Sequence, residues 1–121
     1  MTGALGGMGV EICREFARNG ANVVLLDLDE EKVKAAAADL AAEFGIHAEG
    51  YKMNATDEAE VQAAVDATIA DFGRVDVLVN TAGILRFAAM EDLPLSDWNE
   101  VINVNLTGYF ITSQRFGREM I

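Results

Sequence analysis

Apolar residues recur along this 121-residue chain with two alternating spacings, one helical and one typical of short buried strands. The helical spacing predicts helices over 8–19, 30–44 and about 57–72, each with one apolar stripe. In the first helix the stripe consists of Gly9, Ile12, Cys13, Phe16 and Ala17. Each helix is followed by a glycine, the residue preferred just beyond a helix C-terminus: Gly20, Gly45 and Gly73.

Between the helices lie short apolar runs that predict strands. They are Asn22–Leu26, closed by Asp27, a weaker run over His47–Met53, and Val75–Val79, the best strand candidate in the chain. Runs that are apolar on both faces indicate a sheet covered on both sides. Strands that alternate with helices of this length predict an α/β fold with a parallel sheet and right-handed crossovers. No linker or repeat divides the chain, so we expect one domain or part of one.

The predicted helix starts carry capping residues. The last segment differs from the others in the distribution of its apolar residues. Asp29 is expected to cap the second helix, Thr56 the third, and Ser96 a long segment from Asp97 onward. That segment is apolar on more than one face, which indicates burial on several sides or contact with a partner. Within it, Trp98 is interpreted as a core or interface residue.

Composition and net charge limit the classes of partner and the cellular compartments expected for this chain. A net charge of −11 makes nucleic acid and anionic membrane surfaces poor partners. No apolar run reaches transmembrane length and no signal peptide is visible, so we expect a cytoplasmic protein. Cys13, the single cysteine, excludes an internal disulfide and suits a reducing compartment. His47 is the only histidine and has no cysteine near it, so we expect no metal site.

The strongest candidate for chemistry is the glycine-rich turn over residues 2–9, with the spacing TGxxxGxG formed by Gly3, Gly7 and Gly9. Glycine lets backbone N–H groups approach a ligand, and a helix that starts there directs free N–H groups and partial positive charge at it. Such a turn suits a dinucleotide pyrophosphate. A strand should precede the glycines, but only Met1 and Thr2 do so here.

Polar residues that close the predicted strands are further candidates. Asp27 lies eighteen positions after Gly9, where a carboxylate can accept hydrogen bonds from the adenosine ribose hydroxyls. It would repel a 2′-phosphate, and neither Leu28 nor Gly6 supplies a compensating cation, which favours NAD over NADP. The alternative is a simple loop-entry residue. Asn54 is equally consistent with an adenine contact and with a turn before a helix cap.

For two more features the sequence allows both a functional and a purely structural interpretation. The turn Asn80–Gly83 has small residues that would let a ligand approach the strand end, although an isolated tetrapeptide of this kind is usually just a turn. Asn105 interrupts an apolar helix, and a buried amide there needs partners. It could bend the helix, hold a water near a catalytic group, or be an ordinary satisfied core amide.

Taken together, these motifs resemble the short-chain dehydrogenase/reductase superfamily, in its single-domain branch. Four features match in order across the whole chain: TGxxxGxG over 2–9, Asp27 after a strand, Asn80–Gly83 for NNAG, and Trp98 through Val104–Leu106 for the W…VNL helix. The resemblance implies a Rossmann-like doubly wound parallel sheet, of which residues 1–121 would form the partial NAD(P)-binding domain. The first strand, which should lie mid-sheet, and the C-terminal strands would be absent, so the remaining strands could not simply close together.

The resemblance also implies roles by position. The pyrophosphate would be held by Gly3, Gly7, Met8 and Gly9, the ribose by Asp27, and the adenine end by Asn54 and Ala55. Asn80, Ala82 and Gly83 would line the cofactor and stabilise the central strand. Asn105 would be the tetrad asparagine, which holds a water linked to a proton relay. Asn54 stands in place of a common Asp, and Thr81 in place of an Asn, a change expected to matter little.

The family's catalytic Ser and Tyr-x-x-x-Lys are not found in this chain: four residues after Tyr51 and Tyr109 come Ala55 and Ser113. We therefore expect an N- and C-terminally truncated dehydrogenase that does not catalyse by itself. The full-length form would transfer a hydride between NAD and a secondary alcohol or ketone, such as a sugar, polyol or hydroxy compound, as a homo-oligomer. The alternatives are a non-catalytic dinucleotide-binding or interaction module and an inactive truncated product.

Overall fold

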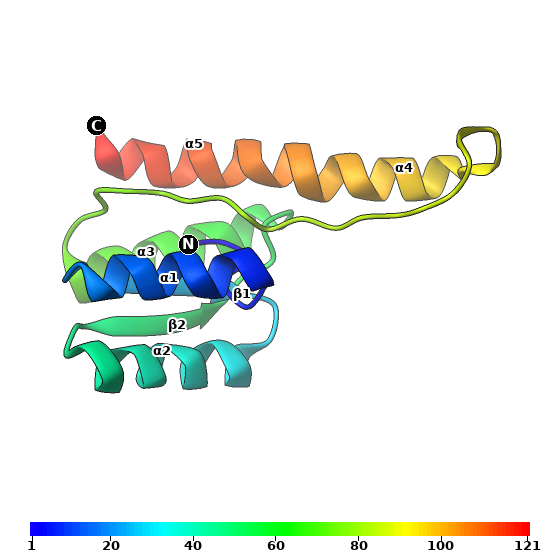
Figure 1. Cartoon of the computed structure of the whole chain (residues 1–121). Helices are drawn as coiled ribbons and strands as arrows, with labels where there is room; N and C mark the ends of the chain where they lie inside the picture. The colour runs from blue at the N-terminus through cyan, green and yellow to red at the C-terminus, as the bar shows by residue number, and fades with distance from the viewer.

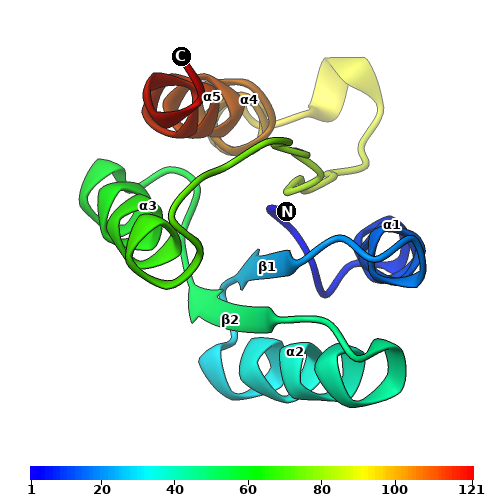
Figure 2. The same cartoon turned by 90° about the vertical axis from the view of Figure 1, so that its left-hand side faces the viewer.

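The computed structural model describes all 121 residues and contains a small parallel sheet covered by helices on both faces (Figures 1 and 2). Strands β1 (Val23–Asp27) and β2 (Ala48–Lys52) pair in parallel, from Val23 opposite Ala48 to Asp27 opposite Lys52. Helix α2 (Glu30–Phe44) makes the crossover between them. The predicted α/β class and parallel pairing are confirmed.

The chain has six further helical elements, of which three complete the two layers over the sheet. The six are α1 (Gly7–Arg18), α3 (Glu58–Phe72), the 3₁₀ turn η1 (Met90–Asp92), α4 (Leu95–Ile102), the π turn η2 (Asn103–Thr107) and α5 (Gly108–Met120). One buried cluster joins α1 and α2 to one face of the sheet and includes Cys13, Val33 and Leu25. The other joins α3 and α5 to the opposite face and includes Val61, Phe116 and Leu26. Helices on both faces make the sheet doubly wound, as predicted, although only two strands form ladders here.

The helix ends follow the local signals except at the starts of two helices, α3 and α4. Gly45 and Gly73 adopt left-handed φ values of 67° and 76° just after α2 and α3. Asp29 caps α2 as predicted, by accepting from Lys32 N at 3.1 Å. The prediction of Thr56 as the cap of α3 is wrong, because Asp57 accepts from the first-turn N–H groups. Thr56 is instead held in a turn by the side chain of the residue two positions before it.

The strand predicted over Val75–Val79 is also wrong for this structure, since these residues form no ladder. Their main chain makes one backbone hydrogen bond, in which Thr2 N donates to Val79 O at 3.0 Å. Only isolated parallel bridges, Thr2 to Leu26 and Thr2 to Asn80, connect this segment with β1. A strand needs a neighbour along its length, and here Met1 and Thr2 are the only residues between the two segments.

Residues 84–121 form an arm whose far part projects away from the sheet (Figure 1). Helix α4 begins at Leu95 with Pro94 before it and no side-chain cap, so the predicted cap at Ser96 is wrong. Pro94 O accepts from Asp97 N and Trp98 N, and the fixed proline φ suits this position. Trp98 is exposed in this chain, which excludes it from the core.

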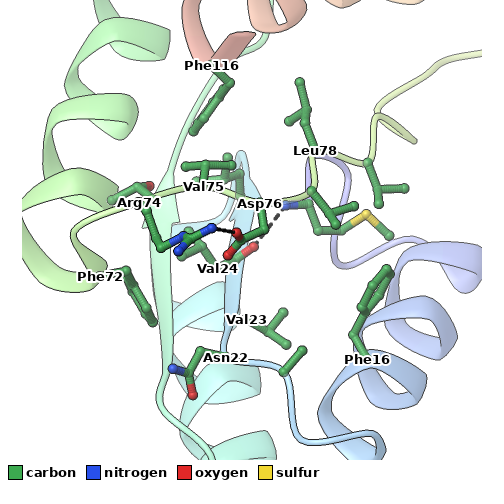
Figure 3. A pocket seen from close by; sticks show the side chains of 16 residues that line it. Phe16, Asn22, Val23, Val24, Phe72, Arg74, Val75, Asp76, Leu78 and Phe116 are labelled. Atoms are coloured by element: carbon green, nitrogen blue, oxygen red, sulfur yellow. Dashed lines mark hydrogen bonds and ion pairs between the residues drawn. The ribbon is translucent and has the colours of Figure 1, made fainter. Parts of the chain in front are cut away.

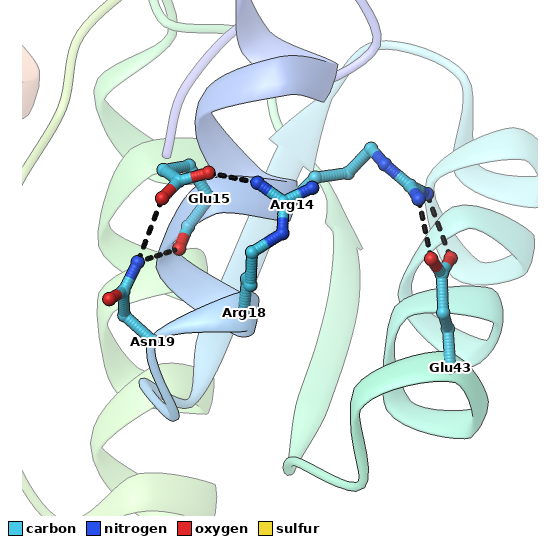
Figure 4. A network of polar contacts seen from close by, with 5 residues as sticks. All are labelled: Arg14, Glu15, Arg18, Asn19 and Glu43. Carbon is cyan, nitrogen blue, oxygen red and sulfur yellow. Dashed lines mark hydrogen bonds and ion pairs between the residues drawn. The ribbon is translucent and has the colours of Figure 1, made fainter.

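A surface network ties the first helix to its neighbour (Figure 4). Arg14 on α1 donates from Nη1 to Glu43 Oε2 on α2 at 2.9 Å, and its guanidinium lies over the Phe44 ring. On the same helix, Arg18 pairs with Glu15. These contacts are exposed to solvent and contribute little to stability, so α1 is positioned mainly by the buried part of its stripe, Gly9, Cys13 and Ala17.

Candidate functional site

The glycine turn is shaped by close backbone contacts. Gly3 has φ 63°, and a Cβ on it would lie 2.6 Å from Ala82 N. A Cβ on Gly9 would overlap Gly3 O and lie 2.9 Å from Ala4 Cα. Both positions therefore require glycine, because the start of α1 packs directly on the turn and the turn packs on the Asn80–Gly83 segment.

The start of α1 is open to solvent beyond these contacts. Gly6 precedes the helix without a side-chain cap, and a Cβ on Gly7 would meet nothing within 4 Å. Met8 is 72% exposed. The N–H groups of the first helical turn have no acceptor within the helix, and the helix dipole adds partial positive charge there. This arrangement can bind an anionic group.

Asp27 lies at the carboxyl end of β1 and holds the glycine turn. Its Oδ2 accepts from Leu5 N at 2.9 Å, and its Oδ1 accepts from Leu28 N at 2.8 Å. The bond to Leu5 brings the turn against the strand end. Each carboxylate oxygen keeps a second lone pair for a ligand hydroxyl. The sequence pattern contained no signal for the contact with Leu5.

Asn54 follows β2 and forms the turn that was one of its two interpretations. Its Oδ1 accepts from Thr56 N at 3.0 Å and from Thr56 Oγ1 at 2.9 Å. Its main-chain N donates to Glu60 Oε2 at 2.7 Å. The side-chain oxygen is therefore engaged, and the amide nitrogen remains as a donor for another group. Ala55 is buried against Gly108 of α5.

Asn80 connects three parts of the molecule. Its Oδ1 accepts from Thr2 Oγ1 at 3.2 Å and from Thr112 Oγ1 of α5 at 3.0 Å. Its Nδ2 donates to Ser113 Oγ at 3.1 Å. Thr2 and Thr112 are fully buried hydroxyl residues that the sequence reasoning missed. For Thr112, the available signal was the presence of a threonine within an apolar stretch of helix.

Thr81 also holds the N-terminal segment. Its hydroxyl donates to Thr2 O at 2.7 Å, and Ala82 N donates weakly to Thr2 Oγ1 at 3.4 Å. The hydroxyl thus has a specific role in attaching the turn before Gly3 to the segment that follows it in space.

Asn105 lies in the π turn η2 between α4 and α5, and it binds the loop beside it. Its Oδ1 accepts from Ile84 N and its Nδ2 donates to Ile84 O, both at 2.9 Å. The prediction of a buried amide is wrong, because Asn105 is exposed, whereas the prediction that it needs partners is correct. A Cβ on Gly83 would lie 3.4 Å from Asn105 Oδ1, so the two residues are neighbours. A π turn within a helix interrupts the regular hydrogen bonds and is frequent at functional sites.

These contacts bring most of the predicted residues to the carboxyl edge of the sheet, where open α/β sheets bind ligands. Gly3 lies against Ala82 and against Gly9, and Gly83 adjoins Asn105. Asn54 and Ala55 stand at the end of the neighbouring strand. No cluster of three His, Cys, Asp or Glu side chains is arranged to hold a metal ion. None of the helices has the length and apolar character needed to cross a membrane.

Comparison with known proteins agrees with this geometry. Residues 1–121 match the family model described as short chain dehydrogenase. D-threitol dehydrogenase of Mycolicibacterium smegmatis is 42% identical over 121 residues, which is 100% of this chain and 46% of that enzyme. The chain thus spans about half the length of the curated relatives it matches.

Solved structures superpose closely. An alcohol dehydrogenase from the archaeon Thermococcus sibiricus, complexed with 5-hydroxy-NADP, aligns with a TM-score of 0.94 at 29% identity, over 99% of this chain and 51% of that one. An NAD⁺-bound xylitol dehydrogenase aligns with a TM-score of 0.93 at 35% identity, over 98% of this chain and 46% of that one. The open helix start above the glycine turn and the strand-end carboxylate agree with the family match over residues 1–121, and this chain belongs to the short chain dehydrogenase family.

Proposed function

We propose that residues 1–121 form the NAD-binding part of an oxidoreductase that transfers a hydride between NAD and a secondary alcohol or ketone. The observation that carries the proposal is the open start of α1, bounded on one side by Gly3 and Gly9 and on the other by the carboxylate of Asp27. Free N–H groups at a helix start bind phosphate oxygens, and a neighbouring carboxylate binds ribose hydroxyls.

The other residues at this edge fit the same occupant. Gly7 and Met8 would contribute amide donors to the pyrophosphate. Asn54 and Ala55 would border the adenine end, with the free amide nitrogen of Asn54 as a donor. Asn80, Ala82 and Gly83 would line the cofactor, and the contacts of Asn80 to α5 would keep that wall in place.

The preference for NAD over NADP rests on charge. Asp27 presents a carboxylate at the end of β1, and exposed Leu28 follows it in place of a cation. A 2′-phosphate in this position would be repelled by the carboxylate. The family includes proteins solved with both kinds of cofactor, so this preference comes from the residues of this chain.

When bound, NAD would accept the hydride, and the protein residues would orient the cofactor and the substrate. In this proposal Asn105, through the π turn and its hold on Ile84, positions a water for a proton relay. The relay's Tyr-x-x-x-Lys is not among residues 1–121, so we expect these residues to bind NAD without turnover. The names of the threitol and xylitol dehydrogenases favour a polyol or related sugar as substrate of the whole enzyme.

The test is a binding titration of the ¹⁵N-labelled 121-residue chain with NAD and with NADP. We expect amide shifts at Gly7 and Met8, and a Kd for NADP that is roughly tenfold higher, which corresponds to about 1.4 kcal/mol of repulsion. Asp27→Asn should reduce that difference. Asp39→Asn, on the exposed side of α2, is the matched control and should leave it unchanged.

Equal binding of the two dinucleotides by the unmodified chain would refute the role of Asp27. Shifts confined to surfaces away from the glycine turn would refute the site itself. A parallel assay with NAD and a panel of polyols should show no NADH formation, and clear formation would refute the expectation that these residues do not catalyse by themselves.

A second candidate is a non-catalytic dinucleotide-binding or interaction module. It is favoured by the apolar surface of the arm over residues 84–121, where Phe87 is 89% exposed and Leu106 and Phe110 are also uncovered. In the enzyme proposal the same helices would pair two copies into a homo-oligomer. The module would keep NAD binding but form no NADH at its full natural length, so a turnover assay on that protein distinguishes the two. In either case we propose a cytoplasmic location, consistent with a single reduced cysteine.

A further inference from the structure

The side chain of Asn54, just after the carboxyl end of β2, is held in one orientation by its neighbours. Its Oδ1 accepts from Thr56 N at 3.0 Å and from Thr56 Oγ1 at 2.9 Å. A main-chain N–H can only donate, so its partner is the oxygen of the Asn54 amide and not the nitrogen. The two bonds occupy both lone pairs of that oxygen, which leaves it no capacity to accept from a ligand.

The amide nitrogen of Asn54 is the free group of this side chain. The only buried side-chain nitrogen or oxygen without a partner is Arg115 Nε, so Asn54 Nδ2, which has no partner either, is accessible. The main chain beside it is fixed, since Asn54 N donates to Glu60 Oε2 at 2.7 Å and Asn54 O accepts from Asp57 N at 3.0 Å. The side chain thus presents a positioned donor and no acceptor.

The next residue adds a second donor. Ala55 N donates to no group of the chain, whereas most main-chain N–H groups in folded proteins have a partner. The side chain of Ala55 is buried against Gly108 of α5, which fixes the position of this residue. Two uncommitted N–H donors, one from a side chain and one from the main chain, therefore follow each other at the end of β2.

These donors stand beside the site proposed for the dinucleotide. Met53 N donates to Asp27 O at 2.8 Å, which holds the segment before Asn54 against the strand that carries the proposed ribose-binding carboxylate. The base is attached to that ribose, so it can reach the end of β2. The apolar cavity of ≈ 340 Å³ between β1 and residues 74–79 is a separate space, because neither Asn54 nor Ala55 lines it (Figure 3).

Adenine and hypoxanthine present opposite hydrogen-bonding groups on the same edge. Adenine has an acceptor at N1 and a 6-amino donor, whereas hypoxanthine has a 6-oxo acceptor and a hydrogen on N1. A pair of protein donors therefore satisfies one group of either base, which is N1 of adenine or the 6-oxo group of hypoxanthine. A carboxylate in place of the Asn54 amide would instead accept from the 6-amino group and favour adenine.

We propose that the base end of this site does not recognise the 6-amino group of adenine, that the chain binds NAD and nicotinamide hypoxanthine dinucleotide alike, and that Asn54 is the residue responsible. The inference rests on the proposed NAD site and adds which groups of the purine that site recognises. Discrimination among dinucleotides then comes from the start of α1 and from Asp27, while the base contributes contact area and one hydrogen bond.

The experiment is a titration of the ¹⁵N-labelled 121-residue chain with NAD and, separately, with nicotinamide hypoxanthine dinucleotide. We expect the two Kd values to agree within about threefold, since each base satisfies one of the two donors. The side-chain NH₂ resonances of Asn54 should shift with the hypoxanthine dinucleotide, because its 6-oxo group is the acceptor for Nδ2. Calorimetry on the protein at its full natural length measures the same ratio.

Three variants locate the recognition. In Asn54→Asp one carboxylate oxygen keeps the bonds to Thr56 and the other accepts from the 6-amino group, so this variant should prefer NAD by roughly tenfold. Asn99→Asp adds the same charge at an exposed position of α4 and should leave the ratio of the unmodified chain unchanged. Glu60→Gln keeps an acceptor for Asn54 N while it removes the neighbouring carboxylate, and it should also leave the ratio unchanged.

Different results would overturn different parts of this reasoning. A larger preference of the unmodified chain for either dinucleotide would refute the proposal, and its loss in Glu60→Gln would show that Glu60 recognises the 6-amino group instead. An unchanged ratio in Asn54→Asp would exclude Asn54 from the base site. Failure of both dinucleotides to bind, or shifts confined to the cavity lining at Val24 and Phe116, would refute the proposed function and this inference with it.

Discussion

Replacing Gly9 with alanine should destabilise the chain, whereas the same replacement at Gly7, two residues earlier on α1, should not. Both residues belong to the same glycine turn and both lie in the first turn of the helix. They differ in surroundings, because a Cβ on Gly9 would overlap Gly3 O while a Cβ on Gly7 would meet nothing within 4 Å.

The magnitude follows from two opposing effects. Forcing extra atoms into a packed site costs about 1–3 kcal/mol, and Gly9 should lie near the upper limit because its neighbours are backbone atoms that cannot rotate away. Alanine in place of glycine within a helix returns about 1 kcal/mol. The expected net loss for Gly9→Ala is about 2 kcal/mol. Gly7→Ala should instead stabilise by about 0.5 kcal/mol, through the reduced freedom of the unfolded chain.

Urea unfolding followed by circular dichroism at constant protein concentration measures both variants against the unmodified chain. Gly9→Ala should also lower Tm by roughly 6 °C or more, given the usual scaling for a domain of this size. Gly7→Ala should weaken NAD binding despite its unchanged or higher stability, because its methyl group lies where the pyrophosphate would bind. Equal stability of Gly9→Ala and the unmodified chain would refute the close-contact reasoning, and so would equal losses for the two variants.

Three further predictions concern single contacts. The Met1 amine has a pKa below its ordinary value because of burial, so the unfolded chain binds more protons and stability should rise with pH up to about 8. Urea midpoints from pH 6 to 9 should show this rise, and N-terminal acetylation should remove it; a rise that persists after acetylation would assign it to other groups. Asn105→Ala should free the main chain of Ile84, with faster amide exchange there and a loss of about 1 kcal/mol, and unchanged protection would contradict the role of that pair. Burial, together with the hydrogen bond to Asp71, raises the pKa of Tyr51, so its stabilising contribution should be complete below about pH 10 and be lost as pH rises further. Tyr51→Phe should remove that part of the alkaline loss, as measured by urea midpoints from pH 9 to 11, and an identical alkaline profile would contradict it.

The features that the sequence predicted correctly depend on neighbours within a few residues. Gly45 and Gly73 end their helices in left-handed conformations that other residues rarely adopt. The stripe that includes Val33 and Ala37 is buried as expected, because residues four apart share a helix face. The α/β class follows from the same local periodicities.

The errors occur where two local signals compete or where a distant partner decides. Thr56 and Asp57 are both suitable N-cap residues. Thr56 is hydrogen-bonded to the side chain of Asn54, and Asp57 caps the helix. Val75–Val79 has strong strand propensity, but a ladder needs a paired neighbour, and the chain places only Met1 and Thr2 beside its end.

In the candidate site, too, some features follow from the local sequence and others depend on distant partners. The sequence by itself determined its parts: the glycine spacing, the carboxylate of Asp27 at a strand end, and the amide of Asn105 in an apolar helix. Only the tertiary structure decided that Asp27 binds the main chain of Leu5 and that Asn105 binds Ile84, twenty-one residues away. Spacing along a chain reports which residue types recur at a helical or strand period, whereas these hydrogen bonds depend on which segments packing brings together. The glycine turn can therefore be predicted from the sequence, whereas the tertiary contacts that hold it in place cannot.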